Sequence, residues 1–233
     1  MMTATYLTRR QKLTQYFDDT AAATWARITS NEPLGRIRAT VRAGRDDMRN
    51  TLLGWLPPRL DGMRLLDAGC GTGSFAIDAA GRGACVTALD ISGTLVDIAR
   101  QRTPAALAAR IDYSVGDMLE PAGGPFDYVV AMDSLIHYAP DDKIAAIAAL
   151  AAQARRGMLF TFAPRTPLLA MMHAVGRVVP RRRHRAPEIE PVAENRLRRR
   201  LSGHEALTGW RVGRTHRVQC GFYVSQAMEL IAP

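Results

Sequence analysis

Lysine is almost absent from this basic chain of 233 residues. Of its 31 basic residues only Lys12 and Lys143 are lysine, and with 22 acidic residues the formal net charge is +9. A strongly basic chain suggests a nucleic-acid partner. The arginines gather late in the sequence, over residues 181–185 and 196–200, where a solvated or anion-facing surface explains them equally well. Charge therefore does not favour nucleic acid as the partner.

Cysteine is scarce, and long apolar runs are absent. Cys70, Cys85 and Cys220 lack the spacing of metal ligands, so we expect free thiols and no metal site. No apolar run reaches the ~18 residues of a membrane helix, and residues 1–12 lack the apolar stretch of a secretory signal. A hydrophobic content of 47% is ordinary for a globular core. We expect a cytoplasmic protein of one domain with an appendage, and peripheral contact with a membrane is the alternative.

A glycine-rich stretch follows the first strand-like segment. Residues 63–66 are apolar and end in Asp67, and three glycines then alternate before an apolar, helix-like segment. The glycines are Gly69, Gly71 and Gly73. Glycine permits a sharp strand-to-helix turn, lets a ligand approach the main chain, and leaves the helix amides facing it. A second apolar segment ends in Asp90, where an acid can bind ribose hydroxyls. A nucleoside-containing ligand is therefore favoured over a turn without a ligand.

The details of this stretch separate one class of nucleoside ligand from others. A dinucleotide fingerprint needs its third glycine one position later, and a phosphate loop needs a lysine where Ser74 stands. Residues 67–73, Asp-Ala-Gly-Cys-Gly-Thr-Gly, resemble motif I of class I S-adenosylmethionine-dependent methyltransferases. The resemblance implies that Asp67 holds the amino-acid end of S-adenosylmethionine and that Ala68 and the glycines pass under it. It also implies that Asp90 binds the ribose and that Ile91 is among the cofactor-binding residues.

Apolar segments of strand and helix type alternate between residues 63 and 163. This alternation predicts a mostly parallel sheet with helices on both faces. We expect strands at 63–67, 84–90, 110–115, 126–132 and 157–163, and helices at about 74–82, 92–102 and 141–154. Two last strands, at 210–219 and 221–231, would form an antiparallel hairpin. The fold class is therefore α/β, a Rossmann-like class I methyltransferase with a seven-stranded sheet.

The ends of the third and fourth strands carry further candidate residues. In methyltransferases of this class an acid at the Asp117 position accepts a hydrogen bond from the adenine amino group, and the backbone at Met118 meets the ring. The resemblance adds Met132 to the cofactor-binding residues.

The residues after the fourth strand indicate which atom of the substrate accepts the methyl group. Many N-methyltransferases carry Asn/Asp-Pro-Pro-Tyr/Phe here, and cytosine C5 enzymes need a Pro-Cys nucleophile, but this chain has neither. Asp133, His137 and Tyr138 stand here instead. An acid, a histidine and a tyrosine suit methylation of oxygen.

Several segments resemble one family more closely, the magnesium-protoporphyrin IX O-methyltransferases of bacteriochlorophyll and chlorophyll synthesis, which serve photosynthesis. The segments are 15–20 with 25–28, 67–73, 132–138 and 160–168. The resemblance implies methyl transfer from S-adenosylmethionine to a propionate of magnesium-protoporphyrin IX. A propionate resembles glutamate, with a pKa of about 4.3, so no strong base is needed.

The same resemblance assigns two catalytic residues. His137 would orient or partly neutralise the propionate, and Asp133 would shape the cofactor side. Some relatives carry a tyrosine in the arm where this chain has Thr29, so no catalytic role of that tyrosine extends to it.

Two segments are expected to cover this site. Residues 1–60 would form a helical arm over the cofactor crevice. Tyr16 and Trp25 are candidate walls of the site, although packing of the arm onto the domain is the favoured explanation for both. Residues 61–233 would form the core, with a lid inserted at about 164–205.

The lid contains Met171 and Met172 as candidate substrate contacts, with plain core packing as an equal alternative. His173 is a less favoured axial ligand of magnesium. Its arginine-rich part, 181–200, would be a loop and helix. A magnesium chelatase subunit or a membrane surface is a candidate partner. The alternatives are methylation of another small acid or RNA, or a non-catalytic S-adenosylmethionine-binding protein.

Overall fold

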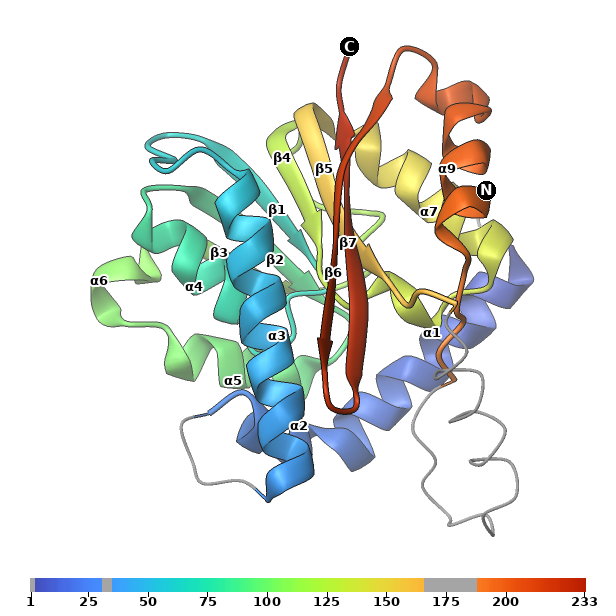
Figure 1. Ribbon diagram of the computed structural model, residues 1–233. Helices are drawn as coiled ribbons and strands as arrows, with labels where there is room; N and C mark the ends of the chain where they lie inside the picture. Colours follow the sequence, from blue (N-terminus) through green and yellow to red (C-terminus); the bar gives the residue numbers. More distant parts are fainter. Residues whose placement is uncertain (1–2, 31–34, 166–187) are drawn as a thin grey trace, which may run out of the picture.

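A seven-stranded sheet forms the centre of the computed structural model, which describes residues 3–30, 35–165 and 188–233 (Figure 1). The strands are β1 Arg64–Ala68, β2 Cys85–Asp90, β3 Ile111–Val115, β4 Phe126–Ala131, β5 Ala154–Phe162, β6 Arg211–Cys220 and β7 Tyr223–Ile231. Their order is β3-β2-β1-β4-β5-β7-β6, and β7 runs antiparallel to both of its neighbours. The expected Rossmann-like sheet with a C-terminal antiparallel hairpin is confirmed.

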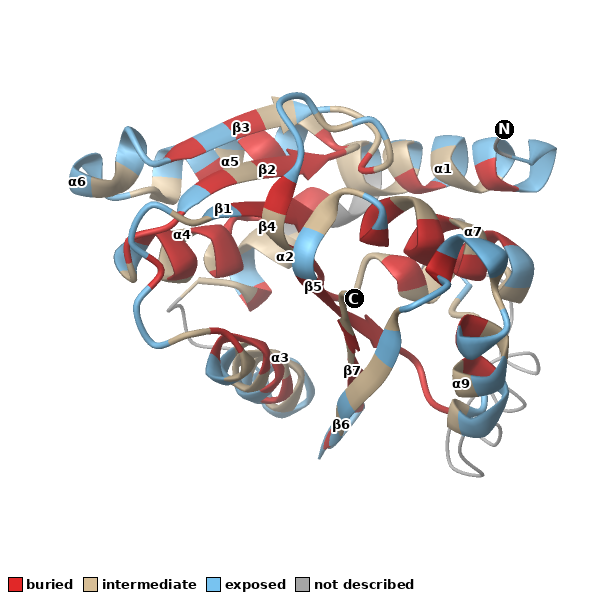
Figure 2. Ribbon diagram, turned by 90° about the horizontal axis from the view of Figure 1, so that it is seen from above, coloured by how far each residue is buried: buried red, intermediate tan, exposed pale blue. Residues whose placement is uncertain are grey.

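Helices cover both faces of the sheet (Figure 2). The helices are α1 Ala4–Tyr16, α2 Ala22–Ile28, α3 Arg36–Trp55, α4 Ser74–Gly81, α5 Gly93–Arg102, α6 Ala105–Ala108, α7 Pro140–Ala151 and α9 Glu194–Ser202. Short helical segments are the π-helix Phe17–Ala21 and the 3-10 turns Leu135–His137 and Glu205–Leu207. Helices α3 and α4 lie on one side of the sheet, and α7 and α9 lie on the other. Both faces therefore bury their apolar side chains, as a parallel sheet requires.

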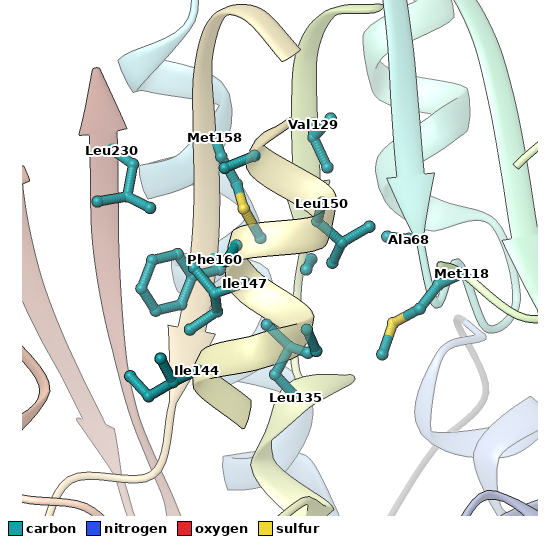
Figure 3. Close-up of a cluster of buried hydrophobic side chains, with 14 of the residues drawn as sticks. Ala68, Met118, Val129, Leu135, Ile144, Ile147, Leu150, Met158, Phe160 and Leu230 are labelled. Atoms are coloured by element: carbon teal, nitrogen blue, oxygen red, sulfur yellow. The ribbon is translucent and has the colours of Figure 1, made fainter. Parts of the chain in front are cut away.

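The contact between α7 and β5 shows how one face is built. Ile144, Ile147 and Leu150 recur every three residues on α7, so they share one side of the helix. They pack onto Met158 and Phe160 of β5 in one buried cluster (Figure 3). Each such side chain contributes about 1.5–3 kcal/mol when fully buried. This packing fixes β5 beside β4 and so fixes the strand ends that carry the site.

The expected boundary between α7 and β5 is wrong. The helix ends at Ala151 rather than residue 154, and β5 begins at Ala154 rather than residue 157. Ala154 already pairs with Phe126 at the start of β4. Alanine favours helix by local propensity, but pairing in the sheet overrides it here.

The N-terminal segment forms a helical arm, as expected, and it stays helical through residues 19–20, where the Asp-Thr pair would suggest a turn. Helix α1 continues through the π-helix into α2. The wider π turn places Asp18 at the start of α5, where its Oδ1 accepts hydrogen bonds from Ser92 Oγ at 2.6 Å and Thr94 N at 3.3 Å. A carboxylate is favoured at a helix N-terminus, so this contact anchors the arm.

The strand order reverses between β1 and β4, and this switch point locates the site. In open α/β sheets, ligands bind outside the carboxyl ends of the strands at such a point. The loops after β1, β2, β3 and β4 all leave the sheet at that edge. Among the residues that the structure describes, no helix is both long and apolar enough to span a bilayer.

Candidate active site

The loop between β1 and α4 forms a cradle of backbone. Gly69, Gly71 and Gly73 have φ of 88°, 54° and 78°, a left-handed conformation that side chains other than glycine rarely adopt. Gly71 N donates to Asp90 Oδ2 at 2.8 Å, and Ser92 N donates to Asp90 Oδ1 at 2.9 Å. Burial raises the pKa of Asp90, and these backbone donors oppose the rise. The acid at the end of β2 is thereby fixed beside the loop.

Replacing Gly69 by alanine should destabilise the protein by about 2–3 kcal/mol. A Cβ at Gly69 would fall inside van der Waals contact with Ser134, whose Oγ donates to Ala68 O at 2.8 Å. Such a loss lowers the melting temperature by about 4–12 °C in a chain of this size. Gly71→Ala is the matched control, because it has a positive φ but nothing within 4 Å of its Cβ. Equal shifts for both variants in thermal unfolding would contradict the steric argument.

Asp67, at the end of β1, carries an unpaired buried oxygen. It is 1% exposed, and its Oδ2 has no hydrogen-bond partner among the described residues. Burial, followed by the nearby charge of Asp90, raises the pKa of Asp67 to about 7, against a backbone hydrogen bond from Ala76. Buried polar groups are normally paired. The open acceptor therefore marks a place where a ligand donor belongs.

Asp117, the expected adenine acceptor, is already bound to the arm. Tyr6 Oη donates to its Oδ1 at 2.7 Å, Leu119 N donates to the same oxygen at 3.0 Å, and Arg10 Nη1 donates to Oδ2 at 2.6 Å. A carboxylate oxygen accepts two hydrogen bonds, so Oδ2 keeps one position for a ligand. Tyr6 also stacks on Tyr138, with ring centroids 4.7 Å apart. This contact favours a packing role for Tyr138 over the expected contact with substrate.

Tyr6→Phe should weaken both the arm and the cofactor site. The phenyl ring keeps the stacking but removes the donor to a buried carboxylate, a loss of about 1–3 kcal/mol. We expect a lower melting temperature and a several-fold weaker affinity for S-adenosylmethionine in calorimetry. Leu7→Ala, an exposed position on the same helix, is the control and should change neither. A Tyr6→Phe variant with unchanged stability would show that the arm is held elsewhere.

Asp133, after β4, is a structural junction. It has a left-handed backbone with φ of 56°, which costs about 1–3 kcal/mol and persists only where surroundings impose it. Its carboxylate accepts hydrogen bonds from Arg45 at 2.7 Å and from Ser225 at 3.1 Å. Tyr223 and Thr161 also donate to it, at 3.0 and 3.1 Å. With its acceptor positions filled in this way, Asp133 is suited to positioning its neighbours rather than to moving a proton.

His137 stands in the 3-10 turn that follows. Its Nδ1 lies 3.3 Å from the carbonyl oxygen of Glu188. Since a carbonyl only accepts, Nδ1 carries the proton and Nε2 presents a lone pair. Desolvation lowers the pKa of His137 to about 4. The ring is therefore neutral at pH 7, and the expected partial neutralisation of a propionate by a charged histidine is not favoured.

A cavity of about 470 Å³ connects these groups. Its wall contains most of the candidate residues: Tyr16, Trp25, Asp67, Gly69, Gly71, Asp90, Ile91, Asp117, Met118, Met132, Asp133, His137 and Tyr138. Ala68 and Gly73 do not line it. Ala68 is fully buried, and a Cβ on Gly73 would lie 2.5 Å from Tyr113 Oη. These two residues shape the loop through their backbone.

The expected lid is only partly described. Met171, Met172 and His173 lie outside the described residues, as does most of the segment 164–205. Within that segment α9 is packed into the core by Leu197 and Leu201, which are both 1% exposed. Across the parts of the chain with assigned structure, no group of three His, Cys, Asp or Glu side chains could hold a metal ion.

The cavity wall also contains residues that sequence reasoning missed. Arg42, Arg45 and Arg49 line it from α3, and their helical spacing was the available signal. Tyr223 reaches it from β7, and nothing in its local sequence indicates this.

Thr29, where some relatives carry a tyrosine, ties the arm to the glycine loop. Thr72 Oγ1 and Arg102 Nη1 donate to Thr29 Oγ1 at 2.9 and 2.7 Å. The Thr29 hydroxyl itself donates to Trp25 O at 2.7 Å. This position therefore has a structural task in the chain.

Comparisons with known proteins agree with this arrangement. A family model described as "Magnesium-protoporphyrin IX methyltransferase C-terminus" matches residues 131–232, and one described as "Methyltransferase domain" matches residues 65–157. The magnesium-protoporphyrin O-methyltransferase of Rhodobacter capsulatus is 42% identical over 229 residues, covering 98% of this chain and 99% of the relative. The enzyme of that name from Synechocystis sp. is 30% identical over 234 residues, covering 99% of each chain.

A solved structure shows the same fold. The crystal structure of magnesium protoporphyrin IX methyltransferase from Synechocystis PCC 6803 with bound SAH superposes with a TM-score of 0.84 at 29% identity. The match covers 96% of this chain and all of the other. The sheet order, the cradle at its switch point and the full-length identity lead to one assignment: the chain belongs to the magnesium-protoporphyrin IX methyltransferase family.

Proposed function

We propose that the protein transfers a methyl group from S-adenosylmethionine to one propionate carboxylate of magnesium-protoporphyrin IX. The product is the monomethyl ester of chlorophyll and bacteriochlorophyll biosynthesis. One observation carries the proposal. A single cavity joins the unpaired Asp67 carboxylate to the neutral His137 beneath an arm that contributes Tyr16, Phe17 and Trp25.

The cofactor half of the cavity fits S-adenosylmethionine. The open Oδ2 of Asp67 suits an ammonium group, and the glycine cradle leaves room for a ligand beside the main chain. Asp90, fixed at the end of β2, suits ribose hydroxyls, and the remaining acceptor position on Asp117 suits an adenine amino group. These four features support the assignment of Asp67, Asp90 and Asp117 as cofactor-binding residues.

The chain's own contribution to the reaction is to place the carboxylate, to exclude water from it and to orient it with a hydrogen-bond acceptor. S-adenosylmethionine supplies the methyl group on a sulfonium, so the protein must bring one carboxylate oxygen into line with it. Aromatic side chains of the arm exclude water from the cavity, which makes a carboxylate less solvated. Desolvation also raises the pKa of a carboxyl group. His137 Nε2, a lone pair on a side chain of the cavity wall, is suited to accept a hydrogen bond from that carboxyl group and so to orient it.

The function is tested by mixing the purified protein with S-adenosylmethionine and magnesium-protoporphyrin IX. We expect mass spectrometry to show a porphyrin heavier by one methylene group. Omitting the methyl donor is the control. No ester, together with intact binding of S-adenosylmethionine, would leave the fold in place and overturn the substrate.

We further propose a transient contact at the cavity mouth with the surface that supplies the porphyrin. Ile37 and Phe222 are 59% and 54% exposed, and Arg36 and Arg38 flank Ile37. Thr40, one turn along α3, packs against Gly221 beside Phe222. Phe222 lines the cavity, and the apolar and basic side chains beside it support a membrane surface, with a magnesium chelatase subunit as the alternative.

A further inference from the structure

Helix α3 lines the cavity with three arginines. Two of them, Arg42 and Arg49, are bound to carbonyl or carboxylate oxygens of the protein. Arg42 donates to the carbonyl oxygens of Ile28 and Arg27 at the end of α2. Arg49 pairs with the carboxylates of Asp46 and Asp78. The bonds of Arg42 tie α3 to α2 and the pair with Asp78 ties α3 to α4, whereas the pair with Asp46 lies within α3.

Arg45 is held differently from its two neighbours. Its Nη1 donates to Asp133 Oδ2 at 2.7 Å, and its guanidinium lies 4.8 Å from the ring centroid of Trp25. Among the described residues, Nε and Nη2 of Arg45 have no hydrogen-bond partner, and the side chain lines the cavity. Arginine presents its donors as a planar fork that matches a carboxylate. One edge of this fork is fixed by the protein, and the other is open.

Asp133 holds the Arg45 guanidinium so that Nε and Nη2 stay available to a ligand. Its strained backbone and its bonds to Tyr223, Ser225 and Thr161 fix the carboxylate that orients Arg45. The three hydroxyl donors satisfy Asp133, so Arg45 is not needed to complete the hydrogen bonding of that acid. The arrangement is that of a preorganised anion-binding group rather than of a surface ion pair.

The substrate in the proposed function has two carboxylates with different needs. The reacting oxygen must keep a lone pair available for the methyl group, and a charge-assisted hydrogen bond from arginine would occupy and stabilise it. The second carboxylate only has to be recognised. The neutral His137 suits the first role, and Arg45 suits the second.

We propose that Arg45 binds the propionate that is not methylated, and so determines which propionate reaches the methyl group. The inference rests on the proposed function. It adds a specificity-determining residue on α3, held in register by Asp133.

Binding without the methyl donor tests the inference. The monomethyl ester product keeps the second propionate, whereas the dimethyl ester of magnesium-protoporphyrin lacks it. Measured by absorption or by quenching of tryptophan fluorescence, the wild type should bind the monoester about 10–100 times more tightly than the diester. Arg45→Gln should bind the two esters within about twofold of each other, and Arg45→Lys should fall between. Arg155→Gln, at an exposed position on β5 that does not line the cavity, should discriminate as the wild type does.

The possible outcomes separate the inference from the function. If the wild type forms the monoester but binds the two esters equally, the inference is overturned and the proposed function stands. This outcome needs no variant. Full discrimination by folded Arg45→Gln would also overturn it. A wild type that binds neither ester and forms no product would overturn the proposed function and the inference together. Product from Arg45→Gln that contains both regioisomers would support the role in selecting the propionate.

Discussion

Replacing Asp67 by asparagine is expected to remove cofactor affinity while making the ligand-free protein more stable. Asp67 Oδ2 is buried and unpaired, so in the proposed complex it is the partner of a cationic ammonium. Breaking a buried ion pair by removing one charge costs about 3–5 kcal/mol. Affinity for S-adenosylmethionine should therefore fall by roughly 10²–10⁴-fold. Isothermal titration calorimetry at pH 8 measures it.

The gain in stability follows from the sign of the pKa shift. Burial raises the pKa of Asp67 from 3.8 to about 7. Between these pH values the native state binds a proton that the unfolded state has released, so this group makes stability fall as pH rises from about 4 to about 7. Above pH 7 the full cost of burying the ionised Asp67 carboxylate lowers the free energy of unfolding by an amount on the order of 4 kcal/mol. Asparagine carries no charge and avoids this penalty.

The difference in the free energy of unfolding between Asp67→Asn and the wild type, measured with denaturant, should therefore grow from pH 4 to pH 7 and stay constant above pH 7. Comparing the two proteins cancels the opposite contribution of His137, whose lowered pKa makes stability rise with pH over part of the same range. Asp97→Asn, an exposed carboxylate on α5, is the control and should alter neither property. Equal stability of the two proteins at pH 8 would refute the cost of burying the unpaired Asp67 carboxylate. Unchanged affinity for S-adenosylmethionine would refute the contact of Asp67 with the cofactor.

The cradle could be predicted from the sequence because its contacts are dictated by local order. Gly71 and Asp90 meet because one βαβ unit places the loop after β1 beside the end of β2. The glycine spacing, the acid at each strand end and the apolar segments together determine that geometry. The same order gave the positions of Asp117 and His137 at the strand ends.

The junction at Asp133 could not be predicted, because its partners come from three separate elements. Arg45 lies on α3, Thr161 on β5 and Tyr223 on β7, and the sheet order brings them together. Sequence periodicity could show that an arm helix exists. It could not show that Tyr6, 111 residues from Asp117, donates to that carboxylate.

Replacing His137 by leucine is expected to lower the turnover rate by roughly 2–10-fold, because one orienting hydrogen bond contributes about 0.5–1.5 kcal/mol. Nδ1 donates to the Glu188 carbonyl, so Nε2 is left as an acceptor on a side chain that lines the cavity. With a pKa of about 4, His137 is too weak a base to take a proton from a carboxyl group whose own pKa is raised by desolvation. Glutamine keeps a hydrogen-bond acceptor, so His137→Gln should lose less than His137→Leu. The affinity for S-adenosylmethionine should change by less than about twofold, because the loss lies in placing the propionate.

The pH dependence of turnover distinguishes simple orientation from proton acceptance. Orientation does not depend on a proton taken by His137, so the rates of the wild type, His137→Gln and His137→Leu should change in parallel between pH 6 and pH 8. His216→Gln, exposed on β6, should follow the wild type. A loss of more than about 10²-fold in His137→Leu, with a rate that rises with pH only in the variant, would show instead that His137 accepts a proton during the reaction.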